Sequence, residues 1–405
     1  MEAIVVLVFV LVYLGMIVGR IPGLGLDRSG LALVGAIALL AIGWFSLTEA
    51  VAAIDASTLS LLFGLMLVSA QLRIGGFYSA VTERMARVDV SPPALLGLMV
   101  VSAGILSALL VNDIAVLAMA PLLIEICVRR SLDPMPFLLG LAAAANVGSA
   151  GTLIGNPQNA LIGQTLDLSF ARYLADGGVP AALGLGIVWL VIAWAYRGKW
   201  TKASPPLAVE RPPFDRWHTI RGLVVLAALI ALFLVGRWPR ELLALVAGGA
   251  LLVFNRGIDS RRILNLVDWQ LLVLFAGLFV VNAALLATSA FGQTTDTLAG
   301  RGVDMSNPAV LFASSAVLSN IVSNVPAVML LLPFAKGEIA GPALALASTF
   351  AGNFLIVGSI ANIIMVDQAG RLGFRITWRD HARIGVPVTL LTLFLAAGWL
   401  WLRAP

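Results

Sequence analysis

Long apolar runs, each close to the length that crosses a bilayer, alternate with short polar connections along most of this chain. A helix needs roughly 20 apolar residues to cross about 30 Å of hydrocarbon. The pattern therefore predicts an all-α polytopic membrane protein with about ten transmembrane helices. They fall near residues 3–19, 31–48, 56–72, 135–166, 178–196, 219–236, 240–254, 268–290, 341–370 and 383–402.

Two further segments, 92–128 and 306–335, are apolar but carry polar residues near their middles, at 111–113 and 323–326. Each half is too short for an untilted span and suits one arm of a re-entrant hairpin. Two of the predicted spans, 135–166 and 341–370, contain internal Gly and Asn residues, so we expect them to be interrupted helices.

Three blocks of sequence recur in the same order in the two halves of the chain. DASTLSLLFGLMLVSA aligns with DWQLLVLFAGLFVVNA, NDIAVLAMAP with NVPAVMLLLP, and ANVGSAGT with GNFLIVGS. The alignment pairs Gly64 with Gly277 and Asn146 with Asn353. Because the two copies start on opposite sides in the crossing count, the sequence predicts an inverted repeat, which is typical of secondary transporters.

These features divide the chain into five parts. They are N-terminal scaffold helices 1–50, a first repeat 51–196 (hairpin 92–128, broken helix 135–166), a cytoplasmic linker 197–218, scaffold helices 219–255, and a second repeat 256–405 (hairpin 306–335, broken helix 341–370).

The basic residues give this layout an orientation. Most of the 26 Lys and Arg residues fall on one side, which the positive-inside rule makes cytoplasmic. The other side receives only Arg172, Arg237, Arg240, Arg301, Lys336 and Arg403. We therefore expect a multi-pass protein of the bacterial inner (plasma) membrane with both termini extracytoplasmic. Because the charges serve as topology signals, the pI near 9.9 does not indicate a nucleic-acid partner.

The composition argues against enzyme chemistry. One cysteine, Cys127, and two histidines cannot build a Cys/His metal cluster, so we predict no metal site and no cofactor other than a coupling ion. His218 and His381 fall at cytoplasmic ends of predicted helices, where neither can activate a serine at the midplane for hydrolysis. A channel is a further alternative, but an inverted repeat favours alternating access.

The helix breaks are the predicted binding site. Backbone groups freed by a break have no water to bond at membrane depth, so breaks persist where protein or a wet cavity satisfies them. Half-helix ends can then bind ions or solutes. The residues predicted to line the site are Asn112, Asn146, Thr152, Asn156, Asn159, Ser323, Asn324, Asn353, Ser359 and Asn362. For any one of them alone, hydrogen bonding between helices is the alternative.

Asp113 is the acidic residue at these breaks, and a carboxylate near the bilayer centre is costly and usually functional. A buried carboxyl group can carry a proton, and beside freed carbonyls it can instead hold sodium. Asp113 is therefore the predicted coupling residue. Its structural alternative is to cap a helix that begins at Ile114. Glu125, just before Arg129 and Arg130, is expected to form a surface ion pair.

No Lys or Arg is predicted at the breaks. An anion would then depend on backbone N–H groups, helix dipoles and co-bound cations, whereas a neutral hydroxylated solute would need only the Ser, Thr and Asn side chains. The residues leave both kinds of substrate open.

The chain resembles the ion transporter superfamily, which includes arsenical efflux permeases, divalent-anion symporters, certain bacterial sodium/proton antiporters and the melanosomal P-protein. The resemblance lies in Asn112-Asp113-Ile114-Ala115 with Pro121, GTLIGNPQN at 151–159, SNIVSNVPAV at 319–328 and GSIAN at 358–362. It implies that two hairpin tips and two interrupted helices form the substrate site, in a moving part supported by a scaffold.

Within the superfamily, the hairpin tips are most similar to the arsenical-permease and P-protein branch. Dicarboxylate symporters carry Ser-Asn-Thr at both tips, whereas this chain has Val111-Asn112-Asp113 and Ser323-Asn324-Val325. The resemblance implies an arsenite/antimonite efflux-type permease coupled to protons by alternating access. Arsenite is largely a neutral trihydroxide at pH 7, and Cys127 alone cannot supply a three-thiolate arsenic site. The alternative is a proton- or sodium-coupled permease for an anion such as sulfate, phosphate or a di- or tricarboxylate.

The expected partners are the lipid bilayer and a small inorganic solute or anion. A homodimer or an ATPase subunit is left open.

Overall fold

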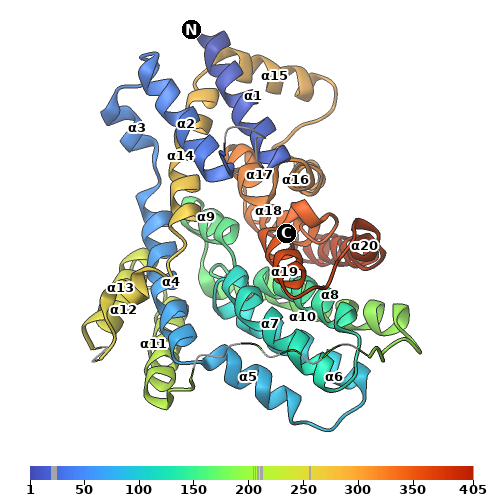
Figure 1. Ribbon diagram of the computed structural model, residues 1–405. Coiled ribbons are helices and arrows are strands. Elements are labelled where there is room, and N and C mark those ends of the chain that lie inside the picture. The colour runs from blue at the N-terminus through green and yellow to red at the C-terminus, as the bar shows by residue number, and fades with distance from the viewer. Residues whose placement is uncertain are drawn as a thin grey trace.

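The computed structural model describes residues 1–19, 25–203, 205, 207, 209, 213–254 and 257–404. Arg20, Arg211 and Arg256, which the charge pattern assigns to the cytoplasmic side, lie outside these residues, as does part of the predicted linker 197–218. The described chain is helical (Figure 1), and an isolated β-bridge pairs Leu132 with Thr201.

Twenty α-helices and two 3-10 turns follow one another through the described residues. Their bounds are α1 Glu2–Val18, α2 Arg28–Ala41, α3 Leu47–Ala53, α4 Ala56–Ile74, α5 Phe77–Ala86, α6 Pro92–Leu109, α7 Asn112–Arg129, α8 Pro134–Ser149, α9 Pro157–Thr165, α10 Phe170–Ala195, α11 Arg216–Val235, α12 Arg240–Phe254, α13 Ser260–Leu264, α14 Trp269–Leu286, α15 Ser289–Gly300, α16 Pro308–Val322, α17 Asn324–Leu331, η1 Leu332–Phe334, α18 Ala340–Ala351, η2 Ile356–Gly358, α19 Ile360–Arg371 and α20 Trp378–Arg403.

Helices stop at each of the four interruptions that the sequence predicts. The chain leaves helical conformation at 110–111, between α6 and α7, and at Ser323, between α16 and α17. Longer breaks separate α8 from α9 at 150–156 and α18 from α19 at 352–359, the second containing η2. Ser323 has φ +76°, a conformation that costs a residue with a side chain about 1–3 kcal/mol. The break there is therefore imposed by the surrounding structure.

The helices pack in two groups (Figure 1). The scaffold bundle consists of α1, α2, α4, α11, α12 and α14, and the hairpin bundle consists of α6–α10 and α16–α20. Gly64 of α4 lies where a Cβ would be 2.4 Å from the backbone of Ala244 on α12, and Gly277 of α14 lies where a Cβ would be 2.6 Å from that of Ala32 on α2. These glycines, which the sequence repeat pairs, let the scaffold helices touch backbone to backbone.

The prediction of an all-helical polytopic membrane protein is confirmed. Six described helices, α4, α6, α10, α11, α14 and α20, are long and apolar enough to cross a membrane. They include α6, which the sequence assigns to one arm of a re-entrant hairpin. The number of crossings, the inverted repeat and the five-part division of the chain stay predictions.

Four short helices, α3, α5, α13 and α15, are absent from the sequence-based layout because they are too polar or too short to give an apolar run. Of these, α5 packs on α7 and connects the two bundles, whereas α15 contributes no buried residue.

Candidate functional site

The two interrupted helices meet through an amide cluster made of Asn146, Asn353, Ser359 and Asn362. The Asn146 amide nitrogen, on α8, donates to Asn353 Oδ1 at 2.9 Å and to Asn362 Oδ1 at 3.2 Å. Its oxygen accepts from Ser359 Oγ at 2.8 Å. All four residues are buried. Asn146 and Asn353, which the sequence repeat pairs, therefore contact each other directly.

The amide cluster also satisfies backbone groups that the second break frees. Asn362 Nδ2 donates to the carbonyl oxygens of Gly352, at 2.8 Å, and Leu355, at 3.1 Å. An unbonded carbonyl in a membrane interior would cost several kcal/mol. The Asn362 side chain thus holds the ends of the break together.

A first-break cluster forms where α9 begins, from Ser149, Asn156, Gln158, Asn159 and Thr349. Asn156 caps α9 by accepting from the Asn159 backbone N–H at 2.8 Å, and its amide donates to Ser149 Oγ at 2.9 Å. Thr349, on α18, accepts from Gln158 Nε2 at 3.3 Å and donates to Asn159 Oδ1 at 3.3 Å. The first break is therefore tied to the second interrupted helix.

Both hairpin tips reach these breaks. The Asn112 backbone N–H donates to the Gly155 carbonyl at 3.1 Å, and Thr152 Oγ1 donates to the Ala108 carbonyl. In the orientation that satisfies its amide, Asn324 Nδ2 donates to the carbonyls of Ser348 and Gly358, 3.0 Å away in each case.

Nine of the ten predicted lining residues thus lie in this network of breaks and tips. The exception is Ser323, whose side chain makes no hydrogen bond within the described residues and whose carbonyl accepts from the Ala327 N–H. Sequence reasoning missed Ser149, Gln158 and Thr349, although each is a polar residue in an apolar run beside a break.

Asp113 lies in the first turn of α7 and is buried, with 9% of its surface exposed. The helix begins at Asn112 and its N-cap residue is Val111, so the alternative in which Asp113 caps a helix starting at Ile114 is wrong. Within the described residues its carboxylate has no hydrogen bond or ion pair, and its electrostatic neighbour is the carboxylate of Asp268. A buried carboxylate without a cationic partner is suited to taking up a proton or a cation.

Glu125 differs from its expected place on the surface. It does pair with Arg129, at 2.5 Å, but its side chain is only 2% exposed while that of Arg129 is 59% exposed. Because α7 packs against α5, α6, α8 and α19, the carboxylate is buried on the inner face of the helix.

Neutral groups dominate the chemistry of the site. The hydrogen bonds of the two clusters involve amides, hydroxyls and carbonyls, with no Lys or Arg side chain among the described partners. The buried polar atoms near the breaks that have no hydrogen-bond partner within the described chain include Ser107 Oγ, Asn112 Oδ1, Ser319 Oγ, Asn320 Oδ1 and Asn353 Nδ2. They supply both donors and acceptors for a ligand. No group of three or more His, Cys, Asp or Glu side chains among the described residues could hold a metal ion.

The scaffold bundle contacts the second hairpin through a buried polar pair. Tyr13 OH, on α1, donates to Asn282 Oδ1 on α14 at 2.8 Å and also lies 3.2 Å from the Pro326 carbonyl on α17. Asn282 Nδ2 donates to Met329 Sδ at 3.5 Å. Any sliding of the hairpin bundle against the scaffold must exchange these bonds.

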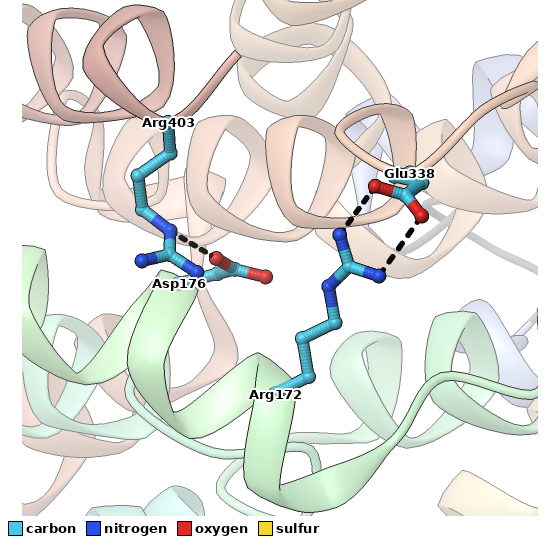
Figure 2. A network of polar contacts seen from close by, with 4 residues as sticks. All are labelled: Arg172, Asp176, Glu338 and Arg403. Atoms are coloured by element: carbon cyan, nitrogen blue, oxygen red, sulfur yellow. Dashed lines mark hydrogen bonds and ion pairs between the residues drawn. The ribbon is translucent and has the colours of Figure 1, made fainter. Parts of the chain in front are cut away.

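Two ion pairs join α10 to the second half of the hairpin bundle (Figure 2). Arg172, on α10, donates two hydrogen bonds to Glu338 in the loop before α18, one of them 3.0 Å long. Arg403 Nε, near the end of α20, donates to Asp176 Oδ1 at 2.6 Å. Hydrogen bonding and charge from Arg172 lower the pKa of Glu338 below its ordinary value.

Comparison with known proteins identifies the family. The profile of a family described as citrate transporter matches residues 6–351. The chain belongs to the citrate transporter family. An uncharacterized transporter of Mycobacterium tuberculosis is 32% identical to this family member over 87% of either chain. The inner membrane protein YbiR of Escherichia coli is 31% identical over 82% of this chain and 84% of its own.

A plant protein and a solved structure extend the comparison. The silicon efflux transporter LSI3 of Oryza sativa is 27% identical over 92% of each chain. The crystal structure of the Alcanivorax borkumensis YdaH transporter matches with a TM-score of 0.60 at 16% identity, covering 99% of this chain and 98% of that one. At this identity the structural match shows the fold alone.

This citrate transporter family member is thus a multi-pass membrane transporter rather than an enzyme. The predicted resemblance to ion transporters is confirmed at the level of this family. Membership in the arsenical-permease branch stays a prediction.

Proposed function

We propose that this protein is a secondary active transporter that exports a small neutral hydroxylated solute, of the arsenite or antimonite type, in exchange for protons by alternating access. One observation carries the proposal. The four helix breaks gather amide and hydroxyl groups without a Lys or Arg side chain among the described partners, and several buried polar atoms there lack partners in the described chain.

A trihydroxide matches these groups. Each hydroxyl of As(OH)3 can donate to Asn112 Oδ1, accept from Asn353 Nδ2, or do both with the hydroxyls of Ser107 and Ser319. A neutral solute also avoids the several kcal/mol that desolvating an unpaired ion costs. The relative named as a silicon efflux transporter supports this class, because dissolved silicon at neutral pH is the uncharged tetrahydroxide.

Asp113 is the proposed proton carrier. Its carboxylate has no cationic or hydrogen-bonding partner within the described residues, so protonation breaks no bond there. In the proposed cycle the carboxyl group takes a proton from the outer side when the site opens outward and releases it into the cytoplasm when the site opens inward. One neutral solute leaves for each proton that enters, so each cycle carries one positive charge inward.

The second candidate is a proton- or sodium-coupled permease for an anion, including citrate, sulfate or phosphate. The description of the family as citrate transporters favours it. Four helices, α7, α9, α17 and α19, begin at the breaks, and helix N-termini present N–H groups that bind anions. Asp113 and Asn112 Oδ1 are oxygen ligands that sodium could use.

The proposed arrangement in the membrane follows the sequence-based layout. Two inverted repeats span the inner membrane with both termini outside, and the scaffold bundle supports a moving hairpin bundle. A homodimer or an ATPase subunit is compatible with it.

Uptake into everted membrane vesicles tests the two candidates. Arsenite, antimonite, silicic acid, sulfate, phosphate and citrate are offered under an imposed proton gradient, with and without sodium, and vesicles without the protein are the control. Accumulation of arsenite that collapses with an uncoupler supports the proposal. Sodium- or proton-driven uptake of an anion, with arsenite ignored, replaces it with the second candidate.

A further inference from the structure

His381 lies on α20, in a place that none of the functional assignments above uses. Its side chain is buried, at 5% exposure, and its Nε2 lies 3.0 Å from the carbonyl oxygen of Asn353. Asn353 belongs to the second break, between α18 and α19. The histidine therefore joins a helix outside the break to the backbone of the break itself.

The Asn353 carbonyl needs this donor. Because α18 ends at Ala351, the carbonyl lies beyond the regular hydrogen bonding of that helix. A freed carbonyl at membrane depth must be satisfied by protein or water. A carbonyl can only accept, so Nε2 carries the hydrogen and the imidazole is fixed in one tautomer when neutral.

A second feature of α20 fits the same carbonyl. Gly385 lies one turn beyond His381, and a Cβ on it would be 2.2 Å from the Asn353 carbonyl oxygen and 3.0 Å from His381 Nε2. A side chain at this position would push the break away from α20. In successive turns, α20 thus presents the His381 donor and the space left by Gly385 to the Asn353 carbonyl.

Asn353 is held on both sides. Its carbonyl is bonded to α20, and its side-chain Oδ1 accepts from Asn146 Nδ2 on α8 at 2.9 Å. We propose that His381 is a positioning residue of the candidate site: by donating to the Asn353 carbonyl, it fixes the second break in the conformation that brings the Asn353 and Asn146 side chains together. The inference rests on the proposed location of the site but not on the identity of the solute.

Three substitutions separate the hydrogen bond from the packing of α20. His381→Leu removes the donor, whereas His381→Gln keeps an amide N–H near the position of Nε2. Thr389→Val is the matched control, because Thr389 is also buried on α20 and reaches a carbonyl of α18, that of Phe350, only at 3.5 Å. All three are made in the full-length protein in lipid nanodiscs.

The first readout is backbone hydrogen exchange of segment 352–359, followed by mass spectrometry. Losing one buried hydrogen bond that holds a local structure should accelerate its exchange by about tenfold in His381→Leu, equivalent to about 1.4 kcal/mol. We expect His381→Gln and Thr389→Val to stay within about threefold of the unsubstituted protein, since each leaves a donor to the break in place.

The second readout is arsenite transport. A break that samples other conformations lowers the fraction of competent sites, so His381→Leu should raise the apparent KM about tenfold and change the maximal rate less. His381→Gln should return the KM to that of the unsubstituted protein. A purely structural role would instead reduce the amount of folded protein and the maximal rate without this rescue.

Unchanged exchange of 352–359 in His381→Leu, or equal acceleration in His381→Leu and His381→Gln, would overturn the inference. If His381→Leu does not fold, Gly385→Ala provides the test, because its Cβ must displace the same carbonyl and should accelerate the same segment. Unchanged exchange there also refutes the positioning role. A protein that shows the expected exchange pattern but moves no arsenite removes the proposed substrate and leaves the role of His381 standing.

Discussion

Asp113→Asn tests the proposed coupling mechanism. The substitution keeps the shape of the side chain and removes its ability to gain and lose a proton. Because the carboxylate has no hydrogen bond or ion pair within the described residues, no such contact is lost. The free energy of unfolding should therefore change by less than about 1 kcal/mol, the net worth of a typical hydrogen bond.

The effect on transport is large by comparison. With one proton exchanged per solute, each unit of pH gradient is worth about 1.36 kcal/mol and sustains roughly tenfold accumulation of a neutral solute. Asp113→Asn should reduce this ratio to one in proteoliposomes with an imposed gradient and no membrane potential. Exchange of labelled for unlabelled arsenite across the same membrane should continue, because it needs no net movement of protons.

Asp268→Asn is the matched control. Asp268 is the electrostatic neighbour of Asp113, and an asparagine there can still accept from the Leu271 N–H and cap α14. We expect this variant to keep gradient-driven accumulation. Full accumulation in Asp113→Asn would refute the coupling role, and equal loss in both variants would show that the effect is not specific to Asp113.

Contacts within the hairpin bundle lead to three further predictions. Thr152→Ala and Asn324→Ala each remove a hydrogen bond between a hairpin and a break. The apparent KM for the transported solute, measured from initial uptake rates, should therefore rise by roughly fivefold to tenfold. An unchanged KM in both variants would show that the binding site lies at other residues. Gly148→Ala should lower the thermal unfolding temperature in detergent, because a Cβ there would lie 2.3 Å from the backbone of α6; an unchanged temperature would contradict the close packing of α6 and α8. Arg172 lowers the pKa of Glu338, so their ion pair stabilises the protein at pH values above the ordinary carboxyl pKa of 4.5 and loses this effect as the pH falls through the lowered pKa. In Glu338→Gln, the unfolding temperature should therefore fall less as the pH is lowered. A pH profile of the unfolding temperature identical to that of the unsubstituted protein would disprove the contribution.

The elements of the fold could be predicted because membrane burial leaves a strong signal in the sequence. The breaks at 110–111, 150–156, 323 and 352–359 follow from polar and glycine residues that interrupt apolar runs. The short helices α5 and α15 could not be found in this way, since an amphipathic or polar helix gives no apolar run.

The sequence predicted most residues of the candidate site, but it did not predict which of them contact each other. The sequence repeat pairs Asn146 with Asn353 and predicts that both line the site, but only the folded chain shows the hydrogen bond between their side chains. The role of His381 was missed because its position near the end of an apolar run is typical of a surface residue. Its partner is a backbone carbonyl, which no residue pattern reveals.

The most direct test of the account is the position of a bound solute. Arsenite soaked into crystals of the full-length protein can be located by the anomalous scattering of arsenic. We expect one arsenic peak between the breaks, placed so that the hydroxyls bound to the arsenic can form hydrogen bonds with Asn112 and Asn353. An arsenic peak confined to the cavity lined by Arg237 and Arg240, or no peak at concentrations that saturate transport, would contradict the proposal that the helix breaks form the transport site.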